Sequence, residues 1–507
     1  MTRFAARGWM LDGLLVAAWL TSVGFVALNV RGGWWGGLAN PTSTLAAGLD
    51  AKEQWFVLSY QGRQVGFSRM AIAPDERNGI PGVSVSDTGR LAFTLLGAPQ
   101  EMTVNSDAFI DANWRLQAFT ASVTSPTAVM RWTGRRQGGM LLISVRTATS
   151  TVTKELRDPN GSAFVNGLSS WTAFHRLRAG QSGRTWVINP LSLSPEVVYF
   201  SVRRREVIDG RPILVVESDM AGLTTTTRVT PSGDVVQETS PLGWELRQSS
   251  MQEAMQTMRA RPEAADFLAA TAVPVNRPLA HPETLESLTL LLEGADASQV
   301  MKVQRPSQTV LPEERLRDYQ AAAPSGPWCL IRLSRPSRVP APKTIPEEIR
   351  RYLKPSTFVQ SDDARILAKA RELIGARTDP WEQATALTQG VFSLVAQRLT
   401  IGMSSALDVL ATPSGDCQEH TVLYTALARS LGLPTRMAAG LVYQQGRFYY
   451  HAWPEVWLGG WIPTDPTLGQ LVADPTHVGL VEAEHENLIA LGPFIGKMRI
   501  QILEAKE

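Results

Sequence analysis

The pattern of hydrophobic positions begins with a long apolar run. Residues 13–30 form eighteen consecutive positions without a charge, and Arg3 and Arg7 precede them. Such a run is just long enough to cross a bilayer as a helix, and the basic residues before it favour a cytoplasmic N-terminus. We therefore predict a single-pass membrane anchor over residues 1–31, with the rest of the chain in the periplasm. The alternative is a cleavable signal peptide, which the end of the run disfavours because it makes a poor cleavage site.

Strand patterns take over after a linker rich in Gly, Pro, Ser and Thr at residues 32–50. Residues 55–60 and 64–70 alternate on either side of a glycine turn, as the two arms of a hairpin do. Further runs rich in β-branched residues follow at 141–145, 197–202, 212–217, 223–229 and 235–239. Their alternation is typical of an antiparallel sheet with one face in water. We therefore predict an antiparallel β-rich domain over residues 51–260, in which His175 stands alone and is interpreted as structural.

Prolines interrupt the next segment, residues 261–345, where only two short strands are expected, at 287–292 and 329–333. We interpret this segment as a small β module or a connector. Helical periodicity follows: residues 361–363 can cap one helix, and residues 379–382 begin a second with proline in its first turn. The chain thus changes from strands to helices as it approaches its C-terminal part.

Composition agrees with a multidomain globular protein. The 507 residues, 44% of them hydrophobic and 19% charged, are too many for one compact core. We expect an α+β multidomain fold that ends in a catalytic domain over residues 346–507. The net charge of +2 gives no reason to expect a nucleic-acid partner. Only two cysteines occur, which excludes a disulfide scaffold and a thiolate zinc site, and we expect no metal or cofactor.

One of the two cysteines lies at the start of a predicted helix. Apolar residues recur at helical spacing at Val422, Leu423, Ala426, Leu427 and Leu431, before Gly432 and Pro434 end the pattern. Cys417 therefore occupies the first turn, where unpaired backbone amides and the helix dipole favour a thiolate. The same amides can stabilise an oxyanion on an attacked carbonyl group. A structural cysteine would be expected within the apolar stripe, so Cys417 is a candidate nucleophile.

Two further motifs supply an imidazole and a carboxylate. His451 begins an aromatic-rich segment that contains Pro454, which predicts an edge strand or a bulged strand. Gly459-Gly460 makes a tight turn and the chain then runs back, so His451 and Asp465 belong to neighbouring ends of a hairpin. The two ends are offset by about three residues, which side-chain reach must absorb. A thiol, an imidazole and a carboxylate are the components of nucleophilic acyl transfer.

These three separated motifs resemble those of the transglutaminase-like superfamily. They are Gly-x-Cys followed by Ala-Leu-Ala-Arg-Ser-Leu-Gly-Leu-Pro-Thr-Arg, then His-Ala-Trp-x-Glu-Val, then Trp-x-Pro-x-Asp-Pro-Thr, and together they cover residues 355–480. The resemblance implies a papain-like core in which Cys417 is the nucleophile and His451 the general base and acid. It implies that Asp465 orients His451. No calcium loop of the Asp-x-Asp kind accompanies the motifs in the sequence.

Several of these residues have a second interpretation. Trp453 and Glu455, beside the histidine, either bind substrate by shaping its pocket or only pack. Cys417 can instead form a disulfide with Cys329, although Cys329 has the setting of a buried strand residue. Asp465 precedes a proline and can be a simple turn former.

The other histidines are weaker candidates. His420 is a second possible base, but its i, i+3 relation to the cysteine gives poor geometry. His477 and His485 lie in a polar segment and are expected in solvent.

The resemblance implies chemistry through a thioester. Water as the acceptor gives a peptidase or amidase and a primary amine gives a cross-linking transglutaminase, and the three residues do not distinguish them. Hydrolysis is what the resemblance more often implies for bacterial members, so we expect hydrolysis of a protein or peptide in the cell envelope. A different hypothesis is a non-catalytic envelope scaffold that binds a partner through the β-rich domain.

Overall fold

The computed structural model describes the chain from residue 51 to its end, with short gaps. The gaps are residues 96–97, 113–114, 126–128, 148–150, 158–162, 165–177, 190–193, 221–222, 232, 242, 260–270, 301–304, 339–343, 399–403, 483–490 and 492–493. The chain divides into two compact units, one ending at Asp266 and the other running from Phe267 to Glu507. The first is built on one large sheet, and the second combines smaller sheets with helices.

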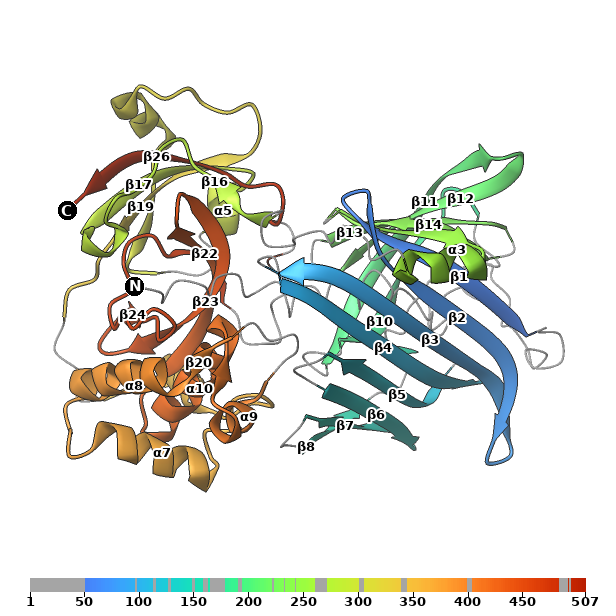
Figure 1. Ribbon diagram of the computed structural model, residues 1–507, viewed down its shortest axis with the longest axis horizontal. Helices are drawn as coiled ribbons and strands as arrows, with labels where there is room; N and C mark the ends of the chain where they lie inside the picture. The colour runs from blue at the N-terminus through green and yellow to red at the C-terminus, as the bar shows by residue number, and fades with distance from the viewer. Residues whose placement is uncertain are drawn as a thin grey trace. The chain divides into compact units, whose positions relative to one another are not determined.

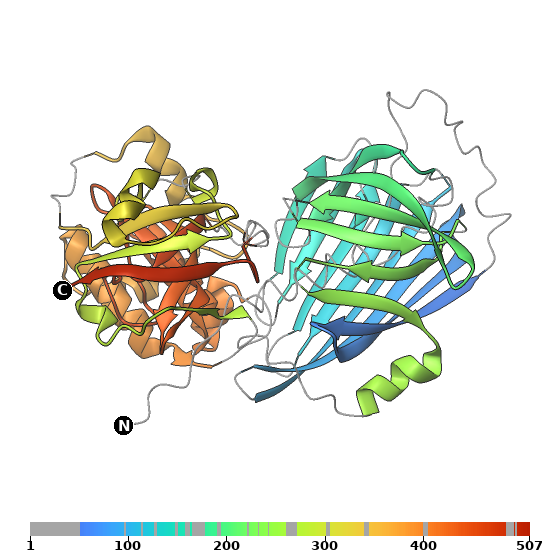
Figure 2. The ribbon, with the colours of Figure 1, turned by 90° about the horizontal axis from the view of Figure 1, so that it is seen from above.

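The first unit contains a fifteen-stranded sheet. Its order is β8-β7-β6-β5-β4-β3-β2-β1-β15-β14-β13-β12-β11-β10-β9, so the pairing of β1 with β15 joins two runs of sequence neighbours (Figure 1). Figure 2 shows the sheet curving, with the green strands β11–β14 across from the blue and cyan ones. The bounds are β1 Lys52–Tyr60, β2 Arg63–Arg77, β3 Ile80–Leu95, β4 Ala98–Asp111, β5 Leu116–Thr124, β6 Val129–Gln137, β7 Met140–Arg146, β8 Thr151–Arg157, β9 Ala163–Phe164, β10 Ser182–Asn189, β11 Ser194–Ile208, β12 Arg211–Met220, β13 Leu223–Val229, β14 Val235–Thr239 and β15 Trp244–Ser249, followed by helix α3 Met251–Arg259.

Residue alternation explains this sheet. Buried positions recur with a period of two along β6 and β7, as expected when one face of a strand packs inward and the other meets water. Trp132 and Ile143 are among the side chains on the buried face. Gly134 is required where it stands, because an added Cβ would lie 2.0 Å from the ring of Phe119 on the adjacent strand.

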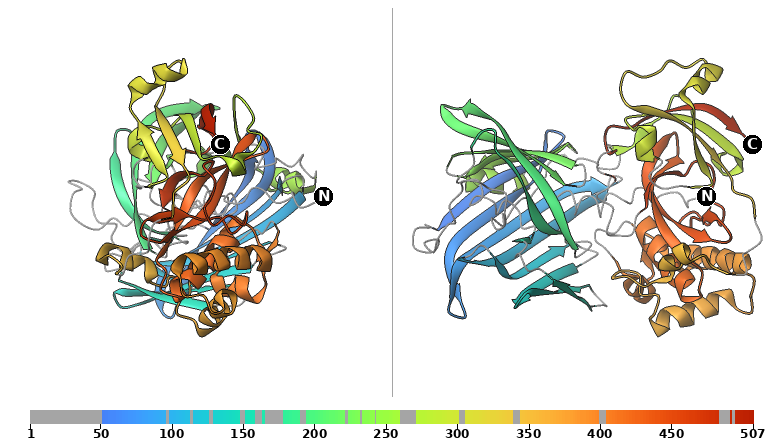
Figure 3. Two further views of the ribbon diagram at one scale, coloured as in Figure 1. Left: turned by 90° about the vertical axis from the view of Figure 1, so that its left-hand side faces the viewer. Right: turned by 180° about the vertical axis from the view of Figure 1, so that it is seen from behind.

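The second unit contains the three motifs. Its five-stranded sheet has the order β16-β23-β22-β25, with β24 paired to β23, and its four-stranded sheet has the order β18-β19-β17-β26. The strands are β16 Val273–Pro274, β17 Ser287–Glu293, β18 Gln308–Leu311, β19 Trp328–Ser334, β20 Ala396–Gln397, β21 Ser414–Gly415, β22 Thr435–Gln444, β23 Arg447–Trp457, β24 Trp461–Pro463, β25 Val478–Glu482 and β26 Arg499–Lys506. The helices are η1 Pro282–Thr284, α5 Ala297–Val300, η2 Glu313–Tyr319, α6 Glu347–Arg350, η3 Arg351–Leu353, α7 Ala364–Ile374, α8 Pro380–Leu394, α9 Ala406–Ala411 and α10 Cys417–Ser430. Helices α7–α10 and the four-stranded sheet lie on opposite sides of the five-stranded sheet (Figure 3).

Local sequence signals set the helix starts. Asp363 and Asp379 accept backbone N–H bonds at the starts of α7 and α8, and Ser405 forms a capping box for α9. Helix α10 is buried along almost its whole length, between the other helices and strands β22 and β23. The most buried helix and the two central strands therefore carry the candidate site.

The structure corrects the expected membrane anchor. Among the residues that it describes, no helix is both long and apolar enough to cross a bilayer. The predicted run at residues 13–30 and the linker at 32–50 fall outside that part of the chain. The expected fold class is corrected in the same respect, because the described chain is dominated by strands. The single-pass, periplasmic location inferred from the anchor is withdrawn with it.

The structure also differs from the expected layout of the C-terminal half. The two strands expected within residues 261–345 are present as β17 and β19, but the C-terminal strand β26 pairs with β17, with Ser287 opposite Lys506. Residues 261–345 and the C-terminal part of the chain therefore share a sheet. Strand β23 is not an edge strand, since it pairs with β22 on one side and with β16 and β24 on the other.

Candidate active site

Cys417 begins helix α10, and its neighbours fix that start. Asp416 is the N-cap: its side chain accepts a hydrogen bond from the backbone N–H of Gln418 at 3.0 Å. Glu419 completes a capping box by accepting the backbone N–H of Asp416 at 2.8 Å. Gly415 leaves room for Glu419, because an added Cβ would lie 2.3 Å from that side chain. The short motif Gly-Asp-Cys-Gln-Glu thus defines the position of the cysteine.

The Cys417 sulfur lies against strand β23 and out of solvent. Its side chain is fully buried, and the backbone N–H of Ala452 donates a hydrogen bond to it. Ala452 directly follows His451 in β23. The fold therefore brings the helix start and the histidine strand together at the sulfur.

The expected thiolate is not the resting form favoured by this environment. Burial raises the pKa of Cys417 well above its ordinary value, and the negative charges of Asp416, Asp465 and Glu419 raise it further. The hydrogen bond from Ala452 acts in the opposite direction but is outweighed. The effect of the helix start is therefore overcome by desolvation and by nearby carboxylates. The thiol needs a base close by to lose its proton.

His451 and Asp465 meet as the hairpin geometry predicts. Strands β23 and β24 pair with Glu455 opposite Pro463, and the backbone N–H of Thr464 donates to the carbonyl of Pro454. If this register is continued, Asp465 lies opposite Trp453, two residues along the strand from His451. The imidazole covers that offset, because His451 Nε2 lies 2.7 Å from Asp465 Oδ2.

Asp465 is a turn former and a partner of the histidine at the same time. Its Oδ1 accepts the backbone N–H groups of Thr467 at 2.8 Å and Leu468 at 3.1 Å, and its backbone is paired with Gln470. Burial alone would raise the pKa of Asp465, but the charge and hydrogen bond of His451 and the hydrogen bond of His477 hold it well below its usual range. The carboxylate is therefore ionised, buried and fully engaged.

His477 is the residue that the sequence analysis placed wrongly. It was expected in solvent, yet it is buried and its Nε2 lies 3.0 Å from Asp465 Oδ2, the same oxygen that His451 contacts. Its Nδ1 lies 3.0 Å from the backbone carbonyl of Asp474. A sequence signal was available: the Asp-Pro-Thr-His stretch repeats the Asp-Pro-Thr of residues 465–467, so a second polar turn beside the first could have been expected.

The cluster raises the question of a bound metal ion. His451, Asp465 and His477 each offer one atom, and these atoms lie within 4.8 Å of one another. Separations of 2.7 and 3.0 Å between nitrogen and oxygen are ordinary N–H···O hydrogen-bond lengths. We assign the three groups to a proton network.

Trp453 and Glu455, the two residues proposed to bind substrate, are both buried in this structure. The Trp453 ring stacks on His451 with centroids 6.1 Å apart and meets His477 edge-on at 5.1 Å. Glu455 forms two ion pairs: its Oε1 lies 2.9 Å from Nε of Arg305, and its Oε2 lies 2.6 Å from Nε of Arg436. These contacts support packing and charge pairing as their roles here.

The remaining candidates take no part in the cluster. His420 is buried, its Nδ1 donates to the carbonyl of Asp416 at 2.5 Å, and burial lowers its pKa. Cys329 and Cys417 are both free thiols, so no disulfide joins them. Burial raises the pKa of Cys329, in the core of β19, to about 12. His175 and His485 lie outside the described residues.

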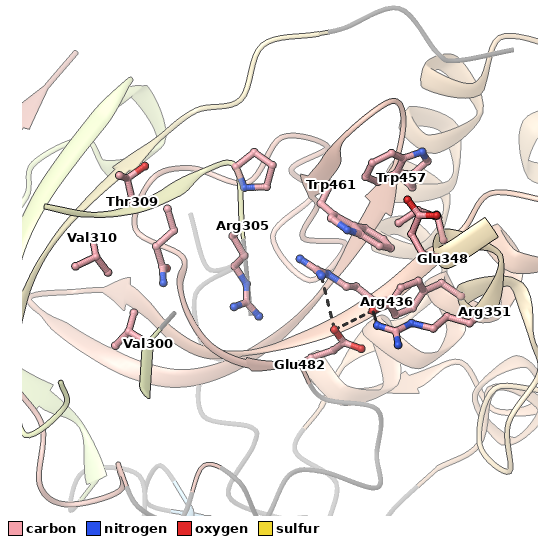
Figure 4. Close-up of a pocket in the computed structure, with 14 residues that line it drawn as sticks. Val300, Arg305, Thr309, Val310, Glu348, Arg351, Arg436, Trp457, Trp461 and Glu482 are labelled. Carbon is pink, nitrogen blue, oxygen red and sulfur yellow. Dashed lines mark hydrogen bonds and ion pairs between the residues drawn. The ribbon is translucent and has the colours of Figure 1, made fainter. Parts of the chain in front are cut away.

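A cavity of about 740 Å³ lies elsewhere in the same unit (Figure 4). Arg436 stacks over the ring of Trp461 in its wall, 4.3 Å from the centroid, and pairs with Glu482 at 3.6 Å. The charged residues that line it are Arg305, Arg351, Arg436, Glu348 and Glu482. Neither Cys417 nor His451 is among its described lining residues, so this cavity is separate from the candidate active site.

Three known proteins are similar to parts of this chain. An uncharacterised protein from Mycobacterium leprae is 36% identical over 74 residues, which cover 13% of this chain and only 26% of that protein's own length. A solved structure from Cytophaga hutchinsonii, named as a candidate cysteine protease, has a TM-score of 0.28 at 20% identity and covers 43% of this chain and 82% of that one. A DUF1089 family protein from Pseudomonas aeruginosa has a TM-score of 0.20 at 17% identity, covering 41% of this chain and 95% of that one.

The two structural similarities are too distant to carry an argument about activity. The family match is specific: residues 368–466 match the transglutaminase-like superfamily, and this span contains the cysteine, the histidine and the aspartate of the three motifs. The C-terminal part of this chain belongs to the transglutaminase-like superfamily.

Proposed function

We propose that this protein is a cysteine enzyme that cleaves amide bonds of a protein or peptide through a thioester on Cys417. The observation that carries the proposal is the 2.7 Å contact between His451 and Asp465, on the strand whose next residue, Ala452, binds the Cys417 sulfur. These contacts support the proposed roles of Cys417 as the nucleophile, His451 as its base and Asp465 as the residue that orients the base.

The protons can be followed through this cluster. Because Nε2 of His451 faces the carboxylate, it carries a proton, and Nδ1 is the ring nitrogen available as a base. His451 Nδ1 takes the proton of the Cys417 thiol as the sulfur attacks the carbonyl carbon. The raised pKa of the thiol makes this transfer part of the reaction, since a stable thiolate is not favoured beforehand.

The helix start supplies the charge stabilisation. The capping box engages the backbone N–H groups of Gln418 and Glu419 with Asp416. The backbone N–H of Cys417 itself is the first-turn amide that we assign to the oxyanion of the tetrahedral intermediate. Collapse of the intermediate breaks the C–N bond, and His451 gives its proton to the leaving amine. Water then attacks the thioester, which releases a carboxylic acid and restores the thiol.

The buried sulfur adds one requirement to this mechanism. Cys417 has no exposed surface in this structure, so the groups over the sulfur must part before a polypeptide can reach it. Opening therefore precedes acylation, and it selects for substrates whose binding compensates for the displaced contacts.

Hydrolysis is favoured over cross-linking within this proposal, because it is what the sequence motifs more often imply for bacterial members of the superfamily. The full-length protein, incubated with casein and a fluorescent primary amine, distinguishes the two. New peptide termini or deamidated glutamines without amine incorporation support hydrolysis, and incorporation into protein replaces it with cross-linking. The Cys417→Ala variant is the control and loses either activity. If that variant acts like the wild type, the proposed chemistry is wrong and the scaffold hypothesis is favoured.

A further inference from the structure

The carboxylate of Asp465 serves two histidines. His451 and His477 both approach Oδ2, at 2.7 and 3.0 Å, while Oδ1 accepts two backbone N–H groups. Four donors fill the acceptor capacity of an ionised carboxylate. An acid that only oriented His451 would need no second imidazole, so the role of His477 requires its own explanation.

The partners of His477 determine its protonation state. Nε2 faces an ionised carboxylate and Nδ1 faces the backbone carbonyl of Asp474, and both of these groups can only accept hydrogen bonds. Each ring nitrogen must therefore carry a hydrogen, and a histidine with two N–H groups is an imidazolium cation. Burial alone would lower the pKa of His477, but the bonds to Asp465 and Asp474 raise it to about 10. The hydrogen-bond geometry and the raised pKa both indicate a protonated His477.

A buried cation has a clear consequence here, because the surrounding groups are mostly acidic. Asp416 and Glu419 on helix α10 and Asp465 beyond β24 all raise the pKa of the Cys417 thiol. On the other side of the cluster, Asp474 also pairs with His477, 3.5 Å from its Nδ1. His451 lies on β23, directly before the residue that binds the sulfur, and its ring centroid is 5.9 Å from that of His477.

We propose that His477 is a positioning residue that remains protonated and offsets the charge of Asp465, so that the Cys417–His451 pair reacts near neutral pH. This inference rests on the proposed function of that pair. Without the positive charge of His477, the negative charge of Asp465 would act on Cys417 and His451 without compensation. Protonated His451 would then be more stable and the thiol harder to ionise, and both changes move reactivity to higher pH.

The pH dependence of Cys417 alkylation tests this without knowledge of the substrate. The rate of carbamidomethylation by iodoacetamide is measured by mass spectrometry on full-length protein from pH 5 to 10. His477→Gln keeps a hydrogen-bond donor but removes the charge, and we expect its profile to shift upward by about one pH unit. On the acidic limb this corresponds to a roughly tenfold slower reaction. His281→Gln, at a histidine whose side chain is 67% exposed, is the matched control and keeps the wild-type profile.

Each outcome has a defined meaning. An unshifted profile, or a loss of rate that is uniform across pH at unchanged thermal stability, overturns the role of the His477 charge. If His451→Ala reacts as fast as the wild type, the proposed function fails instead, because the thiol then does not depend on its base. Should His477→Gln not fold, ¹⁵N spectra of histidine-labelled wild type decide the matter. We expect both His477 ring nitrogens to be protonated at pH 8, and a neutral tautomer there overturns the proposal.

Discussion

Two buried carboxylates in the C-terminal unit are held by different basic side chains. Asp465 is bonded by His451 and His477, whereas Glu455 is bonded by Arg305 and Arg436. Both acids are essentially without exposed surface, and in both cases the basic partners hold the pKa of the acid below its ordinary value against the effect of burial. In both clusters, basic partners thus keep a buried carboxylate ionised.

The two clusters differ in whether their basic side chains can release a proton. A guanidinium remains charged at any physiological pH, so the Glu455 cluster is a fixed ion pair network. An imidazole, unlike a guanidinium, can give up its proton, so the Asp465 cluster offers a candidate base in His451 beside the protonated His477. The comparison teaches that burial and a lowered pKa alone do not identify an active site. The base His451 and the neighbouring thiol of Cys417 are what make the Asp465 cluster the candidate active site.

The largest effect is expected from Asp465→Asn. The amide keeps the size of the side chain but cannot hold both histidines as donors, so His451 loses its orientation and the stabilisation of its charged form. We expect a loss of about 10³–10⁴-fold in kcat/KM, measured with the substrate found for the wild type. Glu455→Gln is the matched control and keeps activity per folded molecule. Equal losses in the two variants would erase the distinction between the clusters.

For the free energy of unfolding we expect the larger effect from Glu455→Gln and not from Asp465→Asn. Glu455→Gln leaves Arg305 and Arg436 buried without a carboxylate between them, which should cost about 3–5 kcal/mol of unfolding free energy. Urea denaturation followed by circular dichroism measures this. A loss below about 1 kcal/mol, the level of an exposed pair, would mean that solvent reaches the Glu455 cluster.

The two clusters should also respond differently to alkaline pH. His477 has a folded pKa of about 10, above its ordinary value of about 6.5. Its contribution to stability is therefore complete below pH 6.5 and is lost as the pH rises through 10. We expect the difference in unfolding free energy between the wild type and His477→Gln to shrink from pH 7 to pH 10. The corresponding difference for Glu455→Gln should stay constant over that range, and a parallel decline would contradict the comparison.

The smallest effect is expected for an exposed ion pair of the same unit. Glu347 lies 3.4 Å from Arg350 on α6, but its side chain is 86% exposed. Glu347→Gln should change the unfolding free energy by less than about 0.5 kcal/mol. A larger loss, measured by the same urea titration, would show that burial is not what makes the Glu455 pair important.

The sequence predicted the parts of the site that local patterns encode. The apolar repeat and its stop signals predicted the helix that begins at Cys417, and the glycine turn predicted the hairpin that joins His451 to Asp465. Helix caps at Asp363 and Asp379 were also recognised, because capping depends on residues within one turn. Each of these features involves neighbours along the chain.

Features that depend on distant contacts were missed. Arg305 reaches Glu455 across 150 positions, and strand β26 joins the sheet of β17 from the end of the chain. His477 was misplaced because a polar surrounding in sequence does not reveal that the chain turns back onto Asp465. The cysteine was expected as a thiolate because the helix start is visible in the sequence, whereas burial and three nearby carboxylates are not. Desolvation is a property of the assembled core.

The central claim is that Cys417, activated by His451 and Asp465, forms a thioester with its substrate. The most direct measurement is acid quenching during turnover of casein, followed by digestion and mass spectrometry of the peptide that contains Cys417. We predict an acyl adduct on Cys417 that hydroxylamine removes and that is absent from His451→Ala. Continued turnover of casein by Cys417→Ala, with no such adduct in the wild type, would contradict the account.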